Sequence, residues 1–440
     1  SGNVQIDSDV VSASGNLSVI AKGSVTFGAA GDLMTASGAA GSGSIDVWAE
    51  AGAIVQHASS VIASTGATAV ARLRAATHIT LGDVVLADGV VSVLSDSGSI
   101  LDADPAASAN DADQDITAAS VRLNAALAIG QSGNDLEVTA TTLSAAAAGG
   151  GIWLLEANDL IVDTVTATTN RVLSDGTVTN STITDAAQSD VRTSGANGSI
   201  VLRTTAGTLT LNNGSAPGAA STPADQAAVV AHGTGNILLQ ALGSDTNVVV
   251  NADVSSTSGN LSVIAKGSVT FAADADLRTT STGASSGSID VWAEAGAITQ
   301  HATSLITSTG ASATARLRAG TDVTVGDIVL TNGLVSITAV AGSILDADQL
   351  DPDQDVTASG LRLAAGTAIG TAANHLETTV GTISASAANG GIWLLEADAL
   401  TVGDVGLSVN RVLSDTTTST SSSTDATQSD IRTTGGNGSI

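Results

Sequence analysis

The chain repeats itself, and this repeat limits the folds that it can adopt. The segment SGNLSVIAKGSVTF at residues 14–27 recurs at 258–271, and GSIDVWAEAGAI follows both copies at the same offset of 244 residues. After an acidic loop that is four residues shorter in the second copy, the offset falls to 240, and GGIWLLEA, NRVLSD and the final GSI keep it. We therefore expect one complete unit over residues 1–244 and a second, truncated unit over residues 245–440.

The last residues indicate that the chain is a piece of a longer protein. The sequence stops at Ile440, whereas the matching stretch of the first copy continues as GSIVLRTT. A stacked repeat protein needs a cap at each end, because an open strand edge invites pairing with other chains. We therefore expect further units in the parent protein.

A shorter pattern within each unit predicts the fold class. Strand cores of the form Gly-x-φ-x-φ-x-Ala, where φ is aliphatic, recur along each unit between Gly, Asn, Asp and Ser corners. They open at Gly15, Gly43, Gly151, Gly198 and Gly235. Two or three short strands per turn are typical of a parallel β-helix, so we predict an all-β solenoid built from tandem repeats of about 240 residues. A string of immunoglobulin-like sandwiches fits less well, because the chain has no Tyr and no sub-repeat of about 100 residues.

The alternation of side chains predicts which residues face the interior of the coil. In GSIDVWAEA, the aliphatic residues at alternate positions from residue 45 point inward, and Asp46, Trp48 and Glu50 point outward. In GGIWLLEA, counting from the glycine at residue 151 places Trp153 inward and Glu156 outward. The predicted interior is narrow and mainly small and aliphatic.

The charge balance narrows the classes of partner. The chain has 42 acidic and 14 basic residues, a formal net charge of −28, and only 1% aromatic residues. Such a surface repels nucleic acid and anionic lipid head groups, and it attracts divalent cations. No apolar run approaches the roughly 20 residues that cross a bilayer, so we expect no membrane insertion in this segment.

The strongest chemical signal is an Asp-rich loop that occurs once in each unit. Alternating Asp residues place several carboxylates on one side of a loop, and Ca²⁺ takes six to eight oxygen ligands. The predicted ligands are Asp102, Asp104, Asp111, Asp113 and Asp115 in the first unit and Asp346, Asp348, Asp351, Asp353 and Asp355 in the second. A solvated acidic loop at a corner of the coil is the alternative, because the loop lacks the EF-hand pattern.

Two outward tryptophans suggest a second kind of site. Trp48 and Trp292 occupy equivalent positions, and a large apolar group on a solenoid face can mark lateral contact with another filament. Alternatively, an inserted segment such as residues 174–190 covers them. Arg72 and Arg74 are expected to face outward and to pair with acids on the neighbouring rung.

The strand cores, the GDLxTAS-type stretch at residues 31–37 and the NxLE…TLSA…GGIWLLEA block resemble filamentous-haemagglutinin-like adhesins. The chain is most similar to giant bacterial β-strand-repeat surface proteins. The resemblance covers the whole chain and implies a right-handed parallel β-helix, secretion across the outer membrane, and roles in adhesion or cell–cell contact. It carries no catalytic residue over to this sequence.

These observations favour an architectural function. We expect a structural segment of a very large secreted or cell-surface bacterial protein that forms an extracellular fibre, sheath or adhesin stalk, stabilised by calcium. The expected partners are further copies in fibres or bundles, and also other cells or surface polysaccharide. A polysaccharide-binding or polysaccharide-cleaving β-helix is the alternative. Enzymatic activity is not expected, because the chain has few aromatic residues and only two lysines to build such a site.

Overall fold

The computed structural model describes residues 2–36, 42–66, 69–104, 113–178, 181–215, 227–348, 353–436 and 438–440. Within these ranges the chain is all-β, with many short strands and no helix. These residues accordingly include no helix that is long and apolar enough to cross a membrane.

The chain divides into two compact units. The first comprises Ser1–Thr205 with Asn212–Ala228, and the second comprises Ala206–Leu211 with Val229–Ile440. This division follows contacts in space, and it does not coincide with the predicted repeat boundary after residue 244, which stays a prediction. We describe each unit by itself.

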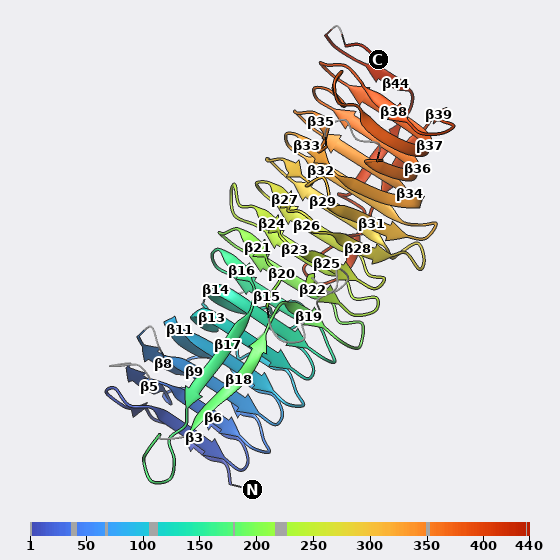
Figure 1. Ribbon diagram of the computed structural model, residues 1–440. Helices are drawn as coiled ribbons and strands as arrows, with labels where there is room; N and C mark the ends of the chain where they lie inside the picture. The colour runs from blue at the N-terminus through green and yellow to red at the C-terminus, as the bar shows by residue number, and fades with distance from the viewer. Residues whose placement is uncertain are drawn as a thin grey trace. The chain divides into compact units, whose positions relative to one another are not determined.

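In the first unit, strands stack in parallel into three columns, and each turn of the chain adds a rung to them (Figure 1). The first column holds β3 (Leu17–Ala21), β6 (Ile45–Ala49), β9 (Val70–Ala75) and the second halves of β11 (Asp83–Ser95), β13 (Ile116–Ala125) and β14 (Leu136–Ala147). The second holds β1 (Val4–Ile6), β4 (Val25–Phe27), β7 (Ile54–Val55), β10 (Ile79–Leu81) and β12 (Ile100–Asp102). The third holds β2 (Val10–Val11), β5 (Leu33–Ala36), β8 (Val61–Thr65) and the first halves of β11, β13 and β14. Later strands of this unit are β15 (Ile152–Glu156), β16 (Leu160–Val162), β19 (Val191–Thr193) and β20 (Ile200–Thr204).

The second unit repeats this arrangement. Its first column contains β26 (Leu261–Ala265), β29 (Ser288–Ala293) and β32 (Thr314–Ala319). Its second column contains β24 (Val248–Val250), β27 (Val269–Phe271), β30 (Ile298–Thr299), β33 (Val323–Val325) and β35 (Ile344–Asp346). Its third column contains β25 (Asp253–Ser256), β28 (Leu277–Thr280) and β31 (Leu305–Thr309). Three longer strands, β34 (Asp327–Ala339), β36 (Val356–Ala365) and β37 (Leu376–Ala387), span the first and third columns. They are followed by β38 (Leu394–Glu396), β39 (Thr401–Val402) and β44 (Ile431–Thr433).

The core of each unit is formed by aligned aliphatic side chains. In the first column, Val47 pairs with Leu73, Leu73 with Val93, and Val93 with Leu123, and all four are fully buried. Parallel pairing in register stacks like on like along the column. The predicted parallel β-helix and the inward alternation from residue 45 are therefore confirmed, while the right hand of the coil stays a prediction.

The long strands turn a corner without a separate loop. The pairing of β11 with β13 shifts register between Leu86 and Val90, and β34 with β36 shifts between Leu330 and Leu334. The bulge needs a residue without a side chain, because a Cβ on Gly89 would lie 2.6 Å from the carbonyl oxygen of Ala69. The bend leaves a hollow on the outer surface of each unit.

Each unit also carries an inserted antiparallel hairpin. In the first unit it consists of β17 (Val165–Asn170) and β18 (Thr182–Gln188), and Figure 1 shows it crossing the strands of the first column. In the second unit it consists of β40 (Val405–Ser408), β41 (Arg411–Val412), β42 (Thr418–Ser419) and β43 (Thr424–Gln428). These hairpins cover outward side chains that would otherwise contact water.

Candidate metal centre and the hairpin network

Three carboxylates from different strands meet at one edge of the first unit. Asp102 ends β12, Asp115 directly precedes β13, and Glu137 lies in β14. One oxygen from each lies within 4.8 Å of the others. Asp355, Asp346 and Glu377 form the same group in the second unit. Each group is called a carboxylate triad below.

The triads are held in place by hydrogen bonds to the backbone and to an asparagine. The backbone N–H of Glu137 donates to Oδ2 of Asp115 at 2.8 Å, and Asn134 Nδ2 donates to Oδ2 of Asp102 at 2.8 Å. The backbone N–H of Asp104 donates to Oδ1 of Asp102 at 2.7 Å. Equivalent bonds hold Asp346 and Asp355 in the second unit. The carboxylates are therefore positioned by the fold.

Burial and crowding of negative charge raise the pKa of one carboxyl in each triad. Burial, followed by the charge of Asp102, raises the pKa of Asp115 far above its ordinary value. Burial and the charge of Asp346 do the same to Asp355. Ionising all three carboxylates together is unfavourable unless a proton or a cation offsets their charge.

The donor set fits a hard cation. Carboxylate oxygens are the ligands that Ca²⁺ and Mg²⁺ prefer, and three protein oxygens would leave room for coordinated water. Of the predicted ligands, the structure brings Asp102 together with Asp115 and brings Asp346 together with Asp355. It adds Glu137 and Glu377, which sequence reasoning missed.

The other predicted ligands do not join the triads. Asp104 is half-buried, and burial together with the charge of the exposed Asp113 raises its pKa. In the second unit Asp348 is half-buried and Asp353 is exposed. Asp111 and Asp351 lie outside the described residues. An alternation of Asp residues in a loop therefore did not identify which carboxylates converge.

The outward tryptophans lie beneath their own hairpins. Trp48 is half-buried, and the guanidinium carbon of Arg171 lies 4.5 Å from its ring centroid. Trp292 meets Arg411 in the same way at 4.2 Å. A cation over an aromatic face is attracted by the ring quadrupole. Lateral contact through Trp48 and Trp292 stays a prediction, but an arginine of the same unit already occupies one face of each ring.

A buried set of ion pairs joins each hairpin to the strands below it. In the first unit the Asp46 carboxylate accepts hydrogen bonds from Arg72 Nη1 at 3.3 Å and from Arg171 Nε at 2.5 Å. Arg72 Nε also donates a hydrogen bond to Oδ1 of Asp185 in β18 at 3.0 Å. The side chain of Asp46 is fully buried, and that of Arg72 is 3% exposed. We call this group the hairpin network. The predicted pairing of Arg72 and Arg74 with acids on neighbouring rungs is confirmed, because Asp46 lies on the rung before Arg72 and the partner of Arg74, Asp96, directly follows β11 on the next rung.

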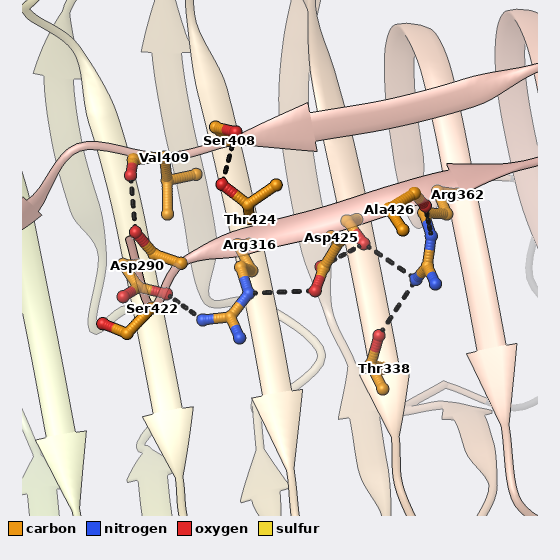
Figure 2. A network of polar contacts seen from close by, with 12 residues as sticks. Asp290, Arg316, Thr338, Arg362, Ser408, Val409, Ser422, Thr424, Asp425 and Ala426 are labelled. Atoms are coloured by element: carbon orange, nitrogen blue, oxygen red, sulfur yellow. Dashed lines mark hydrogen bonds and ion pairs between the residues drawn. The ribbon is translucent and has the colours of Figure 1, made fainter. Parts of the chain in front are cut away.

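The hairpin network recurs in the second unit. Figure 2 shows Arg316 between Asp290 and Asp425, at 2.9 Å and 3.3 Å. Arg411 reaches the second oxygen of Asp290 at 2.6 Å, and Ser336 donates to Asp425 at 2.7 Å. Each buried charge of this network therefore faces an opposite charge of the same unit.

The strand that contains GGIWLLEA has the opposite phase to the one predicted. Ile152, Leu154 and Glu156 are fully buried, while Trp153 stands on the other face and is half-buried. Pairing with β14 decides the phase, because Leu154 stacks on the buried Leu136. The prediction that Trp153 points inward and Glu156 outward was wrong.

Glu156 therefore becomes a buried carboxyl group. Its oxygens accept the backbone N–H of Ala140 at 3.0 and 3.1 Å and that of Asn158 at 3.1 Å. Burial nevertheless raises the pKa of Glu156 to about 8. The equivalent Glu396 is only half-buried and accepts from Val380 and Thr378.

A scan against protein-family models and searches of curated proteins and of solved structures found no match to this chain. The resemblance to surface adhesins is therefore an expectation from sequence pattern alone.

Proposed function

We propose that this chain is a structural segment of a very large secreted or cell-surface bacterial protein that forms an extracellular fibre, sheath or adhesin stalk. The observation that carries the proposal is the recurrence of one architecture. Both units stack parallel strands in register, and both fasten a hairpin over the stack through the same buried ion pairs. Repeated nearest-neighbour stacking adds length without a new kind of core.

The acidic composition supports self-association through divalent cations as the main partnership. The net charge of −28 keeps a long polymer soluble and disfavours nucleic acid. Divalent cations can bridge such acidic surfaces between neighbouring fibres. We assign no catalytic role to the chain.

Location is tested with an antibody raised against the purified chain. The antibody should label intact cells that produce the protein, before any permeabilisation, and electron microscopy should place the label on extended surface material. Labelling that appears only after permeabilisation would contradict the proposal. A known periplasmic protein, stained in parallel, controls for cell integrity.

We also propose that each carboxylate triad binds Ca²⁺ and thereby stabilises its unit. A cation that binds only the folded state raises stability with its concentration. Removing Ca²⁺ with a chelator should lower the midpoint of thermal unfolding, and restoring Ca²⁺ should recover it. Asp115→Asn combined with Asp355→Asn should abolish this response.

A matched control comes from the same acidic loops. Asp113 and Asp353 are exposed, so Asp113→Asn with Asp353→Asn makes the same chemical change in the same loops but leaves both triads intact. The control variant should keep the response to Ca²⁺. Equal loss of the response in both variants would show that calcium acts through general charge screening and not through the triads.

A further inference from the structure

An open groove lies at the strand corner of each unit. In the first unit it has a volume of about 440 Å³ and is lined by Thr117, Thr139, Thr141, Glu156 and Asp159, with alanine methyl groups between them. In the second unit it has a volume of about 340 Å³, and the lining includes Thr357, Ser359, Thr379 and Asp398. Both volumes lie near the lower end of the range for small-molecule sites, roughly 300–1,000 Å³.

The two grooves are built from equivalent positions. Thr117 pairs with Thr139 across neighbouring parallel strands, and Thr357 pairs with Thr379 in the same way. Each pair therefore places two half-buried threonines side by side on adjacent rungs, about 4.8 Å apart. The grooves follow from the repeat and from the corner bulge, so they do not depend on one irregular loop.

The hydroxyl groups on the groove floor are oriented by a second residue. Thr139 donates its hydroxyl proton to Oε1 of Gln114 at 2.9 Å, and Thr379 donates to Gln354 at 3.0 Å. The lone pairs of these hydroxyl oxygens can therefore accept hydrogen bonds from a ligand. One exposed carboxylate also lines each groove, Asp159 in the first unit and Asp398 in the second, so each groove offers mainly acceptors, interleaved with methyl groups.

This surface selects the chemistry of its ligand. An acceptor-rich groove requires a ligand rich in donors, and the alanine methyl groups require apolar C–H faces between those donors. Hexose rings combine hydroxyl donors with C–H faces. Acidic sugars are disfavoured, because the chain carries a net charge of −28 and carboxylates line both grooves.

We infer that each groove binds a short stretch of a neutral hexose chain, with one binding site per unit. This inference goes beyond the structural role proposed above and does not depend on calcium. Several weak sites on one chain would hold a long polysaccharide by avidity. The protein would then bind the glycan along its length without altering it.

The test uses saturation-transfer NMR and titration calorimetry on the whole chain. The probes are maltohexaose and cellohexaose as neutral chains, hexagalacturonic acid as an acidic chain, and spermine as a cationic donor. Saturation transfer to a neutral chain is expected. Binding of spermine or hexagalacturonic acid in preference to both neutral chains would overturn the inference.

Two sets of variants locate the binding. Ala87→Leu with Thr331→Leu fills both grooves from exposed positions, and it should abolish binding of the neutral chain. Thr117→Val with Thr357→Val removes one floor hydroxyl per groove and should weaken binding by about two- to tenfold.

A control pair removes exposed hydroxyls outside the grooves. Thr168→Val with Ser408→Val changes equivalent positions on the two hairpins and should leave binding unchanged. Unaltered far-UV circular dichroism and thermal midpoints show that each variant is folded. Binding that persists in the filled variant, or equal losses in the floor and control variants, would refute the assignment.

Discussion

Removing one carboxylate from the hairpin network tests whether buried ion pairs hold the hairpin down. Asp46→Asn keeps the shape of the side chain but removes a charge that faces both Arg72 and Arg171. Breaking a buried pair by removing one partner costs about 3–5 kcal/mol, because the remaining charge stays buried without compensation. Arg72 keeps Asp185 and Arg171 is partly exposed, so we expect the lower end, about 3 kcal/mol.

The matched control is a surface pair of the same chemistry. Arg74 and Asp96 lie 3.1 Å apart with side chains that are 38% and 37% exposed, and such pairs contribute about 0–1 kcal/mol. Asp96→Asn should therefore change stability by less than 1 kcal/mol. Native-state hydrogen exchange reads out the opening free energy of β17 and β18 directly, and urea unfolding followed by tryptophan fluorescence gives the global value. Equal effects of the two substitutions would refute the reasoning.

Two predictions follow from the raised pKa values. A raised pKa means that the folded chain keeps a proton that the unfolded chain has lost, so stability is greatest at acidic pH and falls as the pH rises. In the presence of a chelator, the free energy of unfolding should therefore fall as the pH rises above the ordinary carboxyl range, and saturating Ca²⁺ should make this fall smaller. A free energy of unfolding that does not change with pH in the chelator would contradict the raised pKa values of Asp115 and Asp355. Glu156→Gln should remove the part of the pH dependence of the free energy of unfolding that lies between about pH 4.5 and 8. Glu396→Gln, at the half-buried equivalent position, should leave that part in place. Matching pH profiles for the two variants would disprove this prediction.

The periodic part of the fold could be predicted from the sequence. Alternation in GSIDVWAEA placed Val47 inward and Asp46 outward, because successive side chains of a strand point to opposite faces and the interior of the coil is mainly apolar. Repetition of this segment at an offset of 244 residues then extended the result to the second unit. These are local rules, and they hold wherever strands stack in register.

The convergence of distant residues could not be predicted in the same way. Asp102, Asp115 and Glu137 meet because consecutive rungs stack, and the loop lengths that set this stacking do not follow from side-chain alternation. The phase of Glu156 depended on pairing with β14 and not on the preceding glycines. From residue type alone, a carboxylate in a strand is predicted to face outward. Hydrogen bonds from backbone donors such as the N–H of Ala140 offset the cost of burying Glu156.

The hairpin network also bears on how a repetitive stack keeps its register. The hairpin lies across the outward face of successive rungs, and these rungs share one strand spacing, so packing alone would let the hairpin settle one rung away at little cost. Asp185 instead accepts from Arg72 and from Ser92 at 2.8 Å, and a shift by one rung would leave these groups buried without partners.

We therefore expect the network to specify position more than to add stability. Replacing Asp46, Arg72, Asp185 and Arg171 together with Leu, Met, Leu and Met should leave global stability within a few kcal/mol, because well-packed apolar groups often match a buried ion network. The same variant should lose the single set of hairpin resonances in NMR and show several exchanging conformers for residues 165–188. A single, native-like set of resonances would show that shape alone positions the hairpin, and the specifying role of the ion pairs would have to be abandoned.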